Sequence, residues 1–220
     1  MRIVSTSDTH LFHRELPVPD GDIFVHAGDL CRMGSLEELA DAAAWICSLP
    51  HETKIVVAGN HDWAFAREPE AARALLGSAV VYLEDADATI GGVRFWGSPW
   101  QPEFMGWAFN LARGPALAAR WALIPTDLDV LVTHGPPLGI GDRTAVGGRQ
   151  GCADLFERTR AARPRIHLFG HLHEDGGLWS IDGTVYANVT ADYCLRPPTI
   201  IDYDPTTREV TPVSVPPARR

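Results

Sequence analysis

Five short blocks of the sequence carry histidine, aspartate and asparagine, and each block follows a run of apolar residues. The blocks are Asp8-Thr9-His10, Gly28-Asp29, Gly59-Asn60-His61-Asp62, His134 and Gly170-His171-Leu172-His173. Imidazole and carboxylate ligands together suit Zn, Mn or Fe, and an amide oxygen is a neutral additional ligand. These side chains are too many for one four-coordinate ion, and they divide well between two.

The spacing within the blocks also suits metal binding. In Asp-x-His and His-x-His, two side chains on an extended segment point to the same face, because side chains alternate along a strand. Glycines beside the blocks (Gly28, Gly59 and Gly170) permit sharp turns where the backbone must come close to an ion. A single histidine at a strand end is typical of an ordinary hydrogen-bonded residue, so only the five blocks together favour a metal site.

The elements that must position these blocks are short β-branched runs with helical patterns between several of them. Strands are expected at residues 2–5, 22–27, 54–58, 80–83, 93–96, 130–133, 166–169, 184–188 and 199–203. A Ser-x-x-Glu capping box at Ser35 and Glu38 predicts a helix that ends at Pro50, and further helices are expected at 69–76, 116–123 and 153–162.

The order of these elements predicts a mixed sheet. The first three strands are separated by longer connections, which suggests parallel βαβ units, whereas the later strands lie closer together and look partly antiparallel. Ligands in open α/β sheets bind beyond the carboxyl ends of the strands. Five strand ends would therefore deliver the five blocks to one region. The segment after Pro212 is rich in proline and is expected to be loose.

Length and charge limit the class of function. The chain has 220 residues, of which 45% are hydrophobic and 21% charged, and this fits one globular domain spanning residues 1–220. Its net charge of −9 disfavours a nucleic-acid polymer or an anionic membrane as partner. No apolar run is long enough to span a membrane, and no signal segment is expected at Met1. The four cysteines form no CxxC pair, so we expect reduced thiols in a cytoplasmic protein.

The five blocks resemble the signature of the calcineurin-like metallophosphoesterase family, which reads D-x-H, G-D, G-N-H-[DE], H and G-H-x-H. Longer stretches, among them GDIFVHAGDL and GSPWQPEFMGWAFNLARG, are similar to the brain-type metallophosphoesterase-domain phosphodiesterases and their bacterial relatives. The resemblance implies an α/β (α+β) fold, a four-layer αββα sandwich of two mixed β-sheets flanked by helices. It also implies two divalent or trivalent transition metal ions (Mn, Fe or Zn). One would be held by Asp8, His10, Asp29 and His173, and the other by Asp29, Asn60, His134 and His171.

The resemblance further implies that His61 lies near the substrate without binding metal, and we expect it to protonate the leaving group. Protein Ser/Thr phosphatases of the family carry Gly-Asp-x-x-Asp-Arg-Gly, in which the second aspartate would orient this histidine. Here the segment reads Gly28-Asp29-Leu30-Cys31-Arg32-Met33-Gly34, without that aspartate. The difference argues against a protein phosphatase and leaves Asp62 as the nominated partner of His61.

Three residues are weaker candidates for substrate contact. Arg143 and Arg149 lie in the Gly-rich loop at residues 139–151 and could clamp phosphate, although a solvated loop charge explains them equally well. Trp107 could stack on a nucleobase, although core packing is the commoner use of such a ring.

Four histidines lie outside the five blocks. His26 and His167 fall inside strand runs and are expected in the core or behind the metal ligands, whereas His13 and His51 are expected at the surface.

The expected function is a dinuclear metal-dependent phosphodiesterase that hydrolyses small phosphodiesters by in-line attack of a metal-bridging hydroxide. The resemblance favours cyclic nucleotides as the substrate class. A phosphomonoesterase with the same metals is the alternative, and a non-catalytic scaffold of the same fold is the alternative from a different class. The expected partner is a small phosphodiester or nucleotide, with no nucleic-acid polymer and no membrane. A homodimer, the native metal and the physiological substrate are left open.

Overall fold

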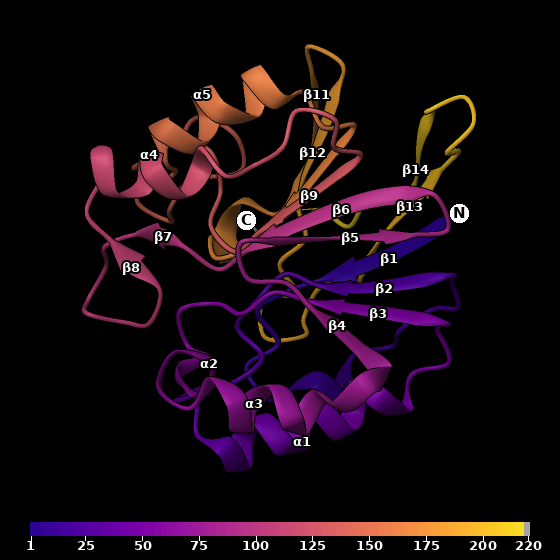
Figure 1. The fold of residues 1–220 in the computed structure, drawn as a ribbon, viewed down its shortest axis with the longest axis vertical. Helices are drawn as coiled ribbons and strands as arrows, with labels where there is room; N and C mark the ends of the chain where they lie inside the picture. The colour runs from indigo at the N-terminus through magenta and orange to yellow at the C-terminus, as the bar shows by residue number, and fades with distance from the viewer. Residues whose placement is uncertain (218–220) are drawn as a thin grey trace.

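Strands form where β-branched runs predict them, and in the computed structural model, which describes residues 1–217, they build two six-stranded sheets (Figure 1). The first sheet has the order β14-β13-β1-β2-β3-β4. Strands β1 to β4 run parallel, and β13 and β14 are antiparallel to their neighbours. Its strands are β1 (Arg2–Thr6), β2 (Ile23–His26), β3 (Thr53–Val56), β4 (Val80–Tyr82), β13 (Thr199–Tyr203) and β14 (Val210–Ser214).

The second sheet has the order β11-β12-β10-β9-β6-β5. Its four central strands are parallel, and the edge strands β5 and β11 are antiparallel to their neighbours. Its strands are β5 (Ala86–Ile90), β6 (Val93–Ser98), β9 (Val130–Thr133), β10 (Ile166–Phe169), β11 (Gly177–Ile181) and β12 (Thr184–Asn188). Two short strands, β7 (Gln101–Pro102) and β8 (Asn110–Leu111), form a separate ladder.

Helices cover the outer face of each sheet (Figure 1). On the first sheet lie α1 (Leu36–Ser48), α2 (Trp63–Arg67) and α3 (Pro69–Leu76), and on the second lie α4 (Pro115–Trp121) and α5 (Ala153–Ala162). Short 3₁₀ turns occur at η1 (His13–Glu15), η2 (Gly77–Ala79) and η3 (His173–Asp175). The Ser35 hydroxyl accepts the Glu38 N–H and caps α1, as the sequence predicts.

Apolar side chains fill three layers. Between the sheets, Val25 and Ile55 of the first sheet belong to one buried cluster with Val130 and Ile166 of the second. Two further clusters join the outer face of each sheet to its helices. Fully burying one such side chain contributes about 1.5–3 kcal/mol. The four layers are therefore helix, sheet, sheet and helix, the αββα sandwich that the family resemblance implies.

Two expectations about the periphery are wrong. Residues 213–217 are not loose, because β14 pairs with β13 and the Arg196 guanidinium donates to the carbonyl oxygens of Pro216 and Pro217, and the rest of the expected loose segment lies outside the described residues. His13 and His51 are not at the surface, with only 1% and 2% of their area exposed. His13 stacks on Trp45 of α1, which covers its ring. His26 and His167 are buried, as predicted.

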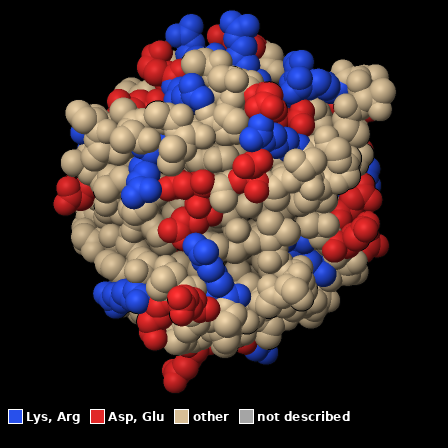
Figure 2. Space-filling model, in the orientation of Figure 1, with Lys and Arg blue, Asp and Glu red and all other residues tan. Residues whose placement is uncertain are grey.

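The surface carries charges of both signs. On the face shown in Figure 2, basic and acidic side chains are interspersed, and the basic ones form no continuous stripe there. Within residues 1–217, no helix combines the length and the apolar character needed to cross a membrane.

Candidate metal centre

The predicted ligands lie just beyond the carboxyl ends of five strands. Asp8 and His10 follow β1, Asp29 follows β2, and Asn60 follows β3 in the first sheet; His134 follows β9, and His171 and His173 follow β10 in the second. The arrowheads of β1, β2 and β3 point to the same end of the molecule (Figure 1). Hydrogen bonds between backbone groups join the loops, from Asp8 N–H to the Gly28 carbonyl and from Gly170 N–H to the His134 carbonyl.

The backbone at this edge adopts conformations that most residues avoid. Asp8, His10, Asp29 and His171 have φ angles of 55°, 43°, 58° and 72°, in the left-handed region. Gly28 has a φ of 103°, and a Cβ there would lie 2.5 Å from Nδ1 of His134. Strain of this kind costs of order 1–3 kcal/mol per residue and is concentrated at functional sites. The fold thus holds these ligand residues in place at some energetic cost.

The first group of ligands comprises Asp8, His10 and His173, whose ligand atoms lie within 4.8 Å of one another. His173 Nε2 lies 3.4 Å from Asp8 Oδ1 and 3.4 Å from His10 Nε2. The other ring nitrogen of His10 donates to the Cys31 carbonyl at 3.0 Å, which leaves Nε2 as a lone-pair donor toward the site.

The second group comprises Asp29, His134 and His171, again within 4.8 Å. His134 Nδ1 donates to the Ala27 carbonyl at 3.0 Å, and Nε2 lies 2.9 Å from Asn60 Oδ1 and 3.4 Å from Asp29 Oδ1. Asp29 also faces the first group, with Oδ2 3.7 Å from His10 Nε2. One oxygen of this carboxylate therefore points to each group.

The donor set fits cations. Asp8 and Asp29 are buried carboxylates. Close to their oxygens lie Nε2 of His10, His134 and His173, and Oδ1 of Asn60 lies beside Nε2 of His134. Burial lowers the pKa of His134, but the charges of Asp29 and Asp8 outweigh it and raise the pKa to about 9. The same balance, with Asp8 as the main partner, raises the pKa of His173 to about 9. The site attracts positive charge at both groups, which a pair of metal ions would satisfy.

Comparison with known proteins agrees with this geometry. The family model described as calcineurin-like phosphoesterase matches residues 1–175. The chain belongs to this family. It is 40% identical over 236 residues to metallophosphoesterase domain-containing protein 1 of Homo sapiens, a match that covers 94% of this chain and 72% of that protein. It is 37% identical over 218 residues to a UPF0046 protein of Caenorhabditis elegans, covering 89% of this chain and 77% of that one.

Solved structures share the fold of this chain. One crystal structure superposes with a TM-score of 0.72 at 17% identity, covering 97% of this chain and 98% of its own. The phosphopantetheinyl hydrolase of Mycobacterium tuberculosis superposes with a TM-score of 0.60 at 16% identity, covering 96% and 95%. At such low identity these matches show the αββα architecture alone.

His61 does not have the partner nominated from the sequence. Its Nδ1 donates to the carbonyl oxygen of Arg32 at 2.6 Å, and the structure gives it no bond to Asp62. The buried Asp62 carboxylate instead accepts the N–H groups of Gly59, Asp29, Leu30 and Cys31 at 2.7–3.3 Å. Asp62 therefore joins the turn that carries Asp29 to the turn that carries Asn60 and His61.

The imidazole ring of His61 also lies close to two of the predicted metal ligands, His10 and Asp29. One of its ring nitrogens lies within 4.8 Å of the ligand atoms of His10 and Asp29, and the ring of Trp107 stacks on it with centroids 4.1 Å apart. This position suits a group that acts on a substrate bound at the two ligand groups.

The two arginines in the Gly-rich loop differ in whether the guanidinium group is already paired. Arg149 Nη1 pairs with the buried Asp142 carboxylate at 2.5 Å, so its charge is already engaged inside the loop. Arg143 is exposed, and its backbone N–H donates to Asp175. The structure leaves Arg143 the better candidate for a substrate contact.

A cavity of about 210 Å³ opens beside His171. Phe104 forms one wall, with its ring 6.5 Å from that of His171 and 54% of its area exposed. Arg113 forms another wall and donates to the carbonyls of Gln150 and Gly151. Phe104 belongs to the aromatic segment at residues 96–109, in which an exposed ring is expected to be able to stack on a nucleobase. Arg113 was not predicted, because it lies in an irregular segment whose sequence carries no strand or ligand pattern.

A second overlooked element follows β12. Asp192, Tyr193 and Cys194 are three successive residues with φ of 47°, 55° and 64°. Asp192 Oδ1 lies 3.4 Å from Nδ1 of His173, and the ring of Tyr193 lies 4.7 Å from that of His173 and 4.9 Å from that of His10. The rule that ligands lie beyond strand ends could have found this segment, since it follows the predicted strand at residues 184–188.

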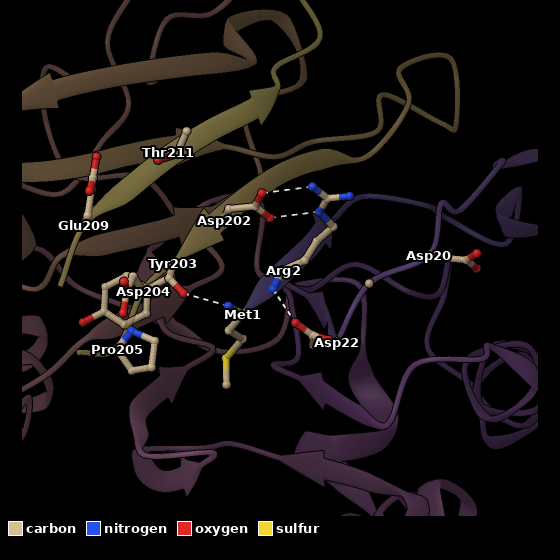
Figure 3. A pocket seen from close by; sticks show the side chains of 11 residues that line it. Met1, Arg2, Asp20, Asp22, Asp202, Tyr203, Asp204, Pro205, Glu209 and Thr211 are labelled. Atoms are coloured by element: carbon tan, nitrogen blue, oxygen red, sulfur yellow. Dashed lines mark hydrogen bonds and ion pairs between the residues drawn. The ribbon is translucent and has the colours of Figure 1, made fainter. Parts of the chain in front are cut away.

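A larger cavity, of about 740 Å³, lies at the end of the first sheet opposite the candidate metal centre (Figure 3). There Arg2 pairs with Asp202 at 2.9 Å, and the terminal amine of Met1 donates to the Tyr203 carbonyl. These residues stand at the start of β1 and the end of the antiparallel β13, so this cavity is separate from the metal centre.

Proposed function

We propose that this phosphoesterase is a dinuclear metal-dependent phosphodiesterase of small phosphodiesters, with cyclic nucleotides as the favoured class and Mn, Fe or Zn as the metals. The observation that carries the proposal is the Asp29 carboxylate, which directs Oδ1 to His134 and Oδ2 to His10. A carboxylate shared in this way suits two ions held side by side.

Each side of Asp29 has its own set of ligands. Asp8, His10 and His173 would hold one ion, and Asn60, His134 and His171 the other. Bound there, the two ions would supply a nucleophile from water and offset charge on the phosphoryl oxygens. Asp8 and Asp29 offset part of the positive charge of the ions, which favours a singly charged diester over a doubly charged monoester.

His61 supplies the proton for the leaving group in this proposal. Its Nδ1 proton is committed to the Arg32 carbonyl, so the doubly protonated ring would give its Nε2 proton to the leaving alkoxide and remain as the neutral ring with its proton on Nδ1. Positioned proton transfer of this kind contributes about 10²–10⁴ in rate. Trp107 keeps the ring in place from one side.

The size and lining of the cavity beside His171 favour a substrate with a small leaving group or a nucleobase. At about 210 Å³ it is smaller than most drug-sized binding sites, and its exposed Phe104 ring offers a surface for stacking. The net charge of −9 and the mixed charges in Figure 2 support a small substrate over a nucleic-acid polymer. The four free cysteines support a reducing compartment, and we propose the cytoplasm.

Removal and return of metal tests the proposal. The protein would be stripped of metal and given Mn²⁺, Zn²⁺ or Fe²⁺ singly, and assayed with bis-(4-nitrophenyl) phosphate, 4-nitrophenyl phosphate, and 2′,3′- and 3′,5′-cyclic AMP. Metal-restored hydrolysis that favours the diesters is the expected result. Preference for the monoester would instead indicate a phosphomonoesterase, and inactivity with two ions bound would indicate a non-catalytic scaffold.

A further inference from the structure

The capping box at the start of α1 is only half formed. In such a box the glutamate accepts the N–H of the capping residue itself. Here Glu38 Oε2 accepts three N–H groups of the preceding loop, those of Arg32 at 3.1 Å, Met33 at 2.8 Å and Gly34 at 2.8 Å. One carboxylate oxygen therefore gathers three successive amides, an arrangement that capping the helix does not require.

The loop whose N–H groups donate to Glu38 is also the loop that contacts His61. The Arg32 carbonyl accepts the Nδ1 proton of His61 at 2.6 Å, while Arg32 Nε donates to the carbonyl of His10 at 3.0 Å. Gly34 fits closely against the residues after His61, because a Cβ on it would collide with the His61 carbonyl and the Trp63 N–H. Residues 32–34 therefore contact both the turn that carries His10 and the turn that carries His61.

The two hydrogen bonds share one peptide group. The carbonyl of Arg32 and the N–H of Met33 belong to the same planar amide and point in opposite directions. A carboxylate that accepts this N–H draws electron density toward the oxygen, and hydrogen bonds in such a chain strengthen one another. The negative charge of Glu38 therefore makes the Arg32 carbonyl a better acceptor for the His61 proton.

We propose that Glu38 is a positioning residue for His61, acting through the Arg32–Met33 peptide group. The relay provides the orienting charge for which protein phosphatases of the family would use the aspartate that this chain lacks. It fixes the proton of His61 on Nδ1 and so keeps Nε2 directed at the substrate. This inference rests on the proposed function, in which His61 protonates the leaving group.

The kinetic test uses substrates that differ in their need for that proton. Bis-(4-nitrophenyl) phosphate releases a stable anion, whereas diphenyl phosphate releases a more basic one that depends more on protonation. With Zn²⁺-loaded protein, Glu38→Ala should lower kcat on diphenyl phosphate about tenfold and Glu38→Gln about threefold, with less than a twofold change on the nitrophenyl diester. Glu37→Gln, an exposed neighbour on the same turn, should change neither.

A double variant separates positioning from folding. In a His61→Ala background, Glu38→Ala should cause no further loss of kcat, because its effect passes through His61. Metal content and Tm, measured on each variant, identify any that fail to fold, and Glu38→Gln preserves the shape of the side chain. An equal loss on both substrates, or a loss that persists without His61, would overturn the inference.

A spectroscopic readout does not need activity. In the Zn²⁺-loaded protein, the imidazole ¹⁵N and ¹H signals of His61, assigned by their absence in His61→Ala, should show the proton on Nδ1 in a strong hydrogen bond. That proton should move to higher field in Glu38→Gln and stay in place in Glu37→Gln. An unchanged signal in Glu38→Gln would refute the relay, whether or not the protein is active. Inactivity of the wild-type protein would instead refute the proposed function, and the NMR signal would still test the relay.

Discussion

The indole ring of Trp107 stacks on the imidazole ring of His61, with centroids 4.1 Å apart and planes 30° from parallel. Trp107 lies in the irregular segment between β7 and β8, and the N–H of the next residue, Ala108, donates to the carbonyl of Asn60. The segment that contributes Phe104 to the cavity is thereby joined to the turn that carries His61. In the proposed function, this stack of two rings would couple substrate binding to proton transfer.

Loss of the stack should weaken proton transfer while metal binding is unaffected. Trp107→Ala removes the ring that covers one face of His61, and we expect kcat on diphenyl phosphate to fall about 2–10-fold, since aromatic pairs contribute about 0.5–1.5 kcal/mol beyond burial. Trp107→Phe should retain most of the activity. Kinetics and metal analysis on both variants check this, and a loss confined to KM would assign Trp107 to substrate binding alone.

His61→Ala should lower kcat about 10²–10⁴-fold with two metal ions retained per chain. The distinction matters because a ring nitrogen of His61 lies close enough to His10 and Asp29 to serve as a ligand. Metal analysis of the purified variant decides between the roles. Loss of one ion along with activity would make His61 a ligand.

The carboxylate behind His173 should strengthen the first metal site. Asp192 lies 3.4 Å from Nδ1 of His173, and such partners orient a ligand imidazole and raise its basicity. Asp192→Asn should weaken metal affinity at that site about 10–100-fold, measured by titration of the stripped protein. Asp20→Asn, at an exposed site beside the cavity of about 740 Å³, is the matched control and should leave the metal affinity unchanged.

His167 should make the fold sensitive to acid. Burial lowers the pKa of His167 to about 3, and its Nε2 hydrogen bonds with the Thr133 hydroxyl at 2.8 Å. The unfolded chain then binds a proton between about pH 6.5 and pH 3 that the folded protein does not, so the free energy of unfolding falls as pH falls through this window. The contribution is about 3 kcal/mol between pH 7 and pH 4.

Urea unfolding at several pH values measures this slope. His167→Leu removes the titrating group, so the difference in unfolding free energy between pH 7 and pH 4 should be smaller in the variant than in the wild-type protein. Equal slopes in the two proteins would show that His167 is not the group responsible.

The sequence predicts the parts of the fold that follow from apolar patterns. All nine predicted strands are present, and most of them are buried runs between the two layers of helices. The edge strands β5, β11 and β14 were not predicted, because their side chains are exposed or half-buried and so show no buried apolar run. Buried His13 was not predicted either, because its burial depends on Trp45 of α1.

At the candidate metal centre, the gathering of the side chains was predictable and the roles of the backbone groups were not. Asp8 and His134 stand in short patterns whose spacing indicates the chemistry. The acceptor for His61 is a main-chain carbonyl, which any residue at position 32 would supply, so the sequence pointed to Asp62 instead. The role of Glu38 was similarly hidden, because its bonds go to three backbone amides.

The number of metal ions per chain tests the dinuclear site most directly. Protein reconstituted with Mn²⁺ would be analysed by mass spectrometry of its metal content, alongside His173→Ala from the first ligand group and His134→Ala from the second. The account predicts two ions in the wild-type protein, about one in each variant, and diesterase activity only with two. A single ion in the wild-type protein with full diesterase activity would contradict it.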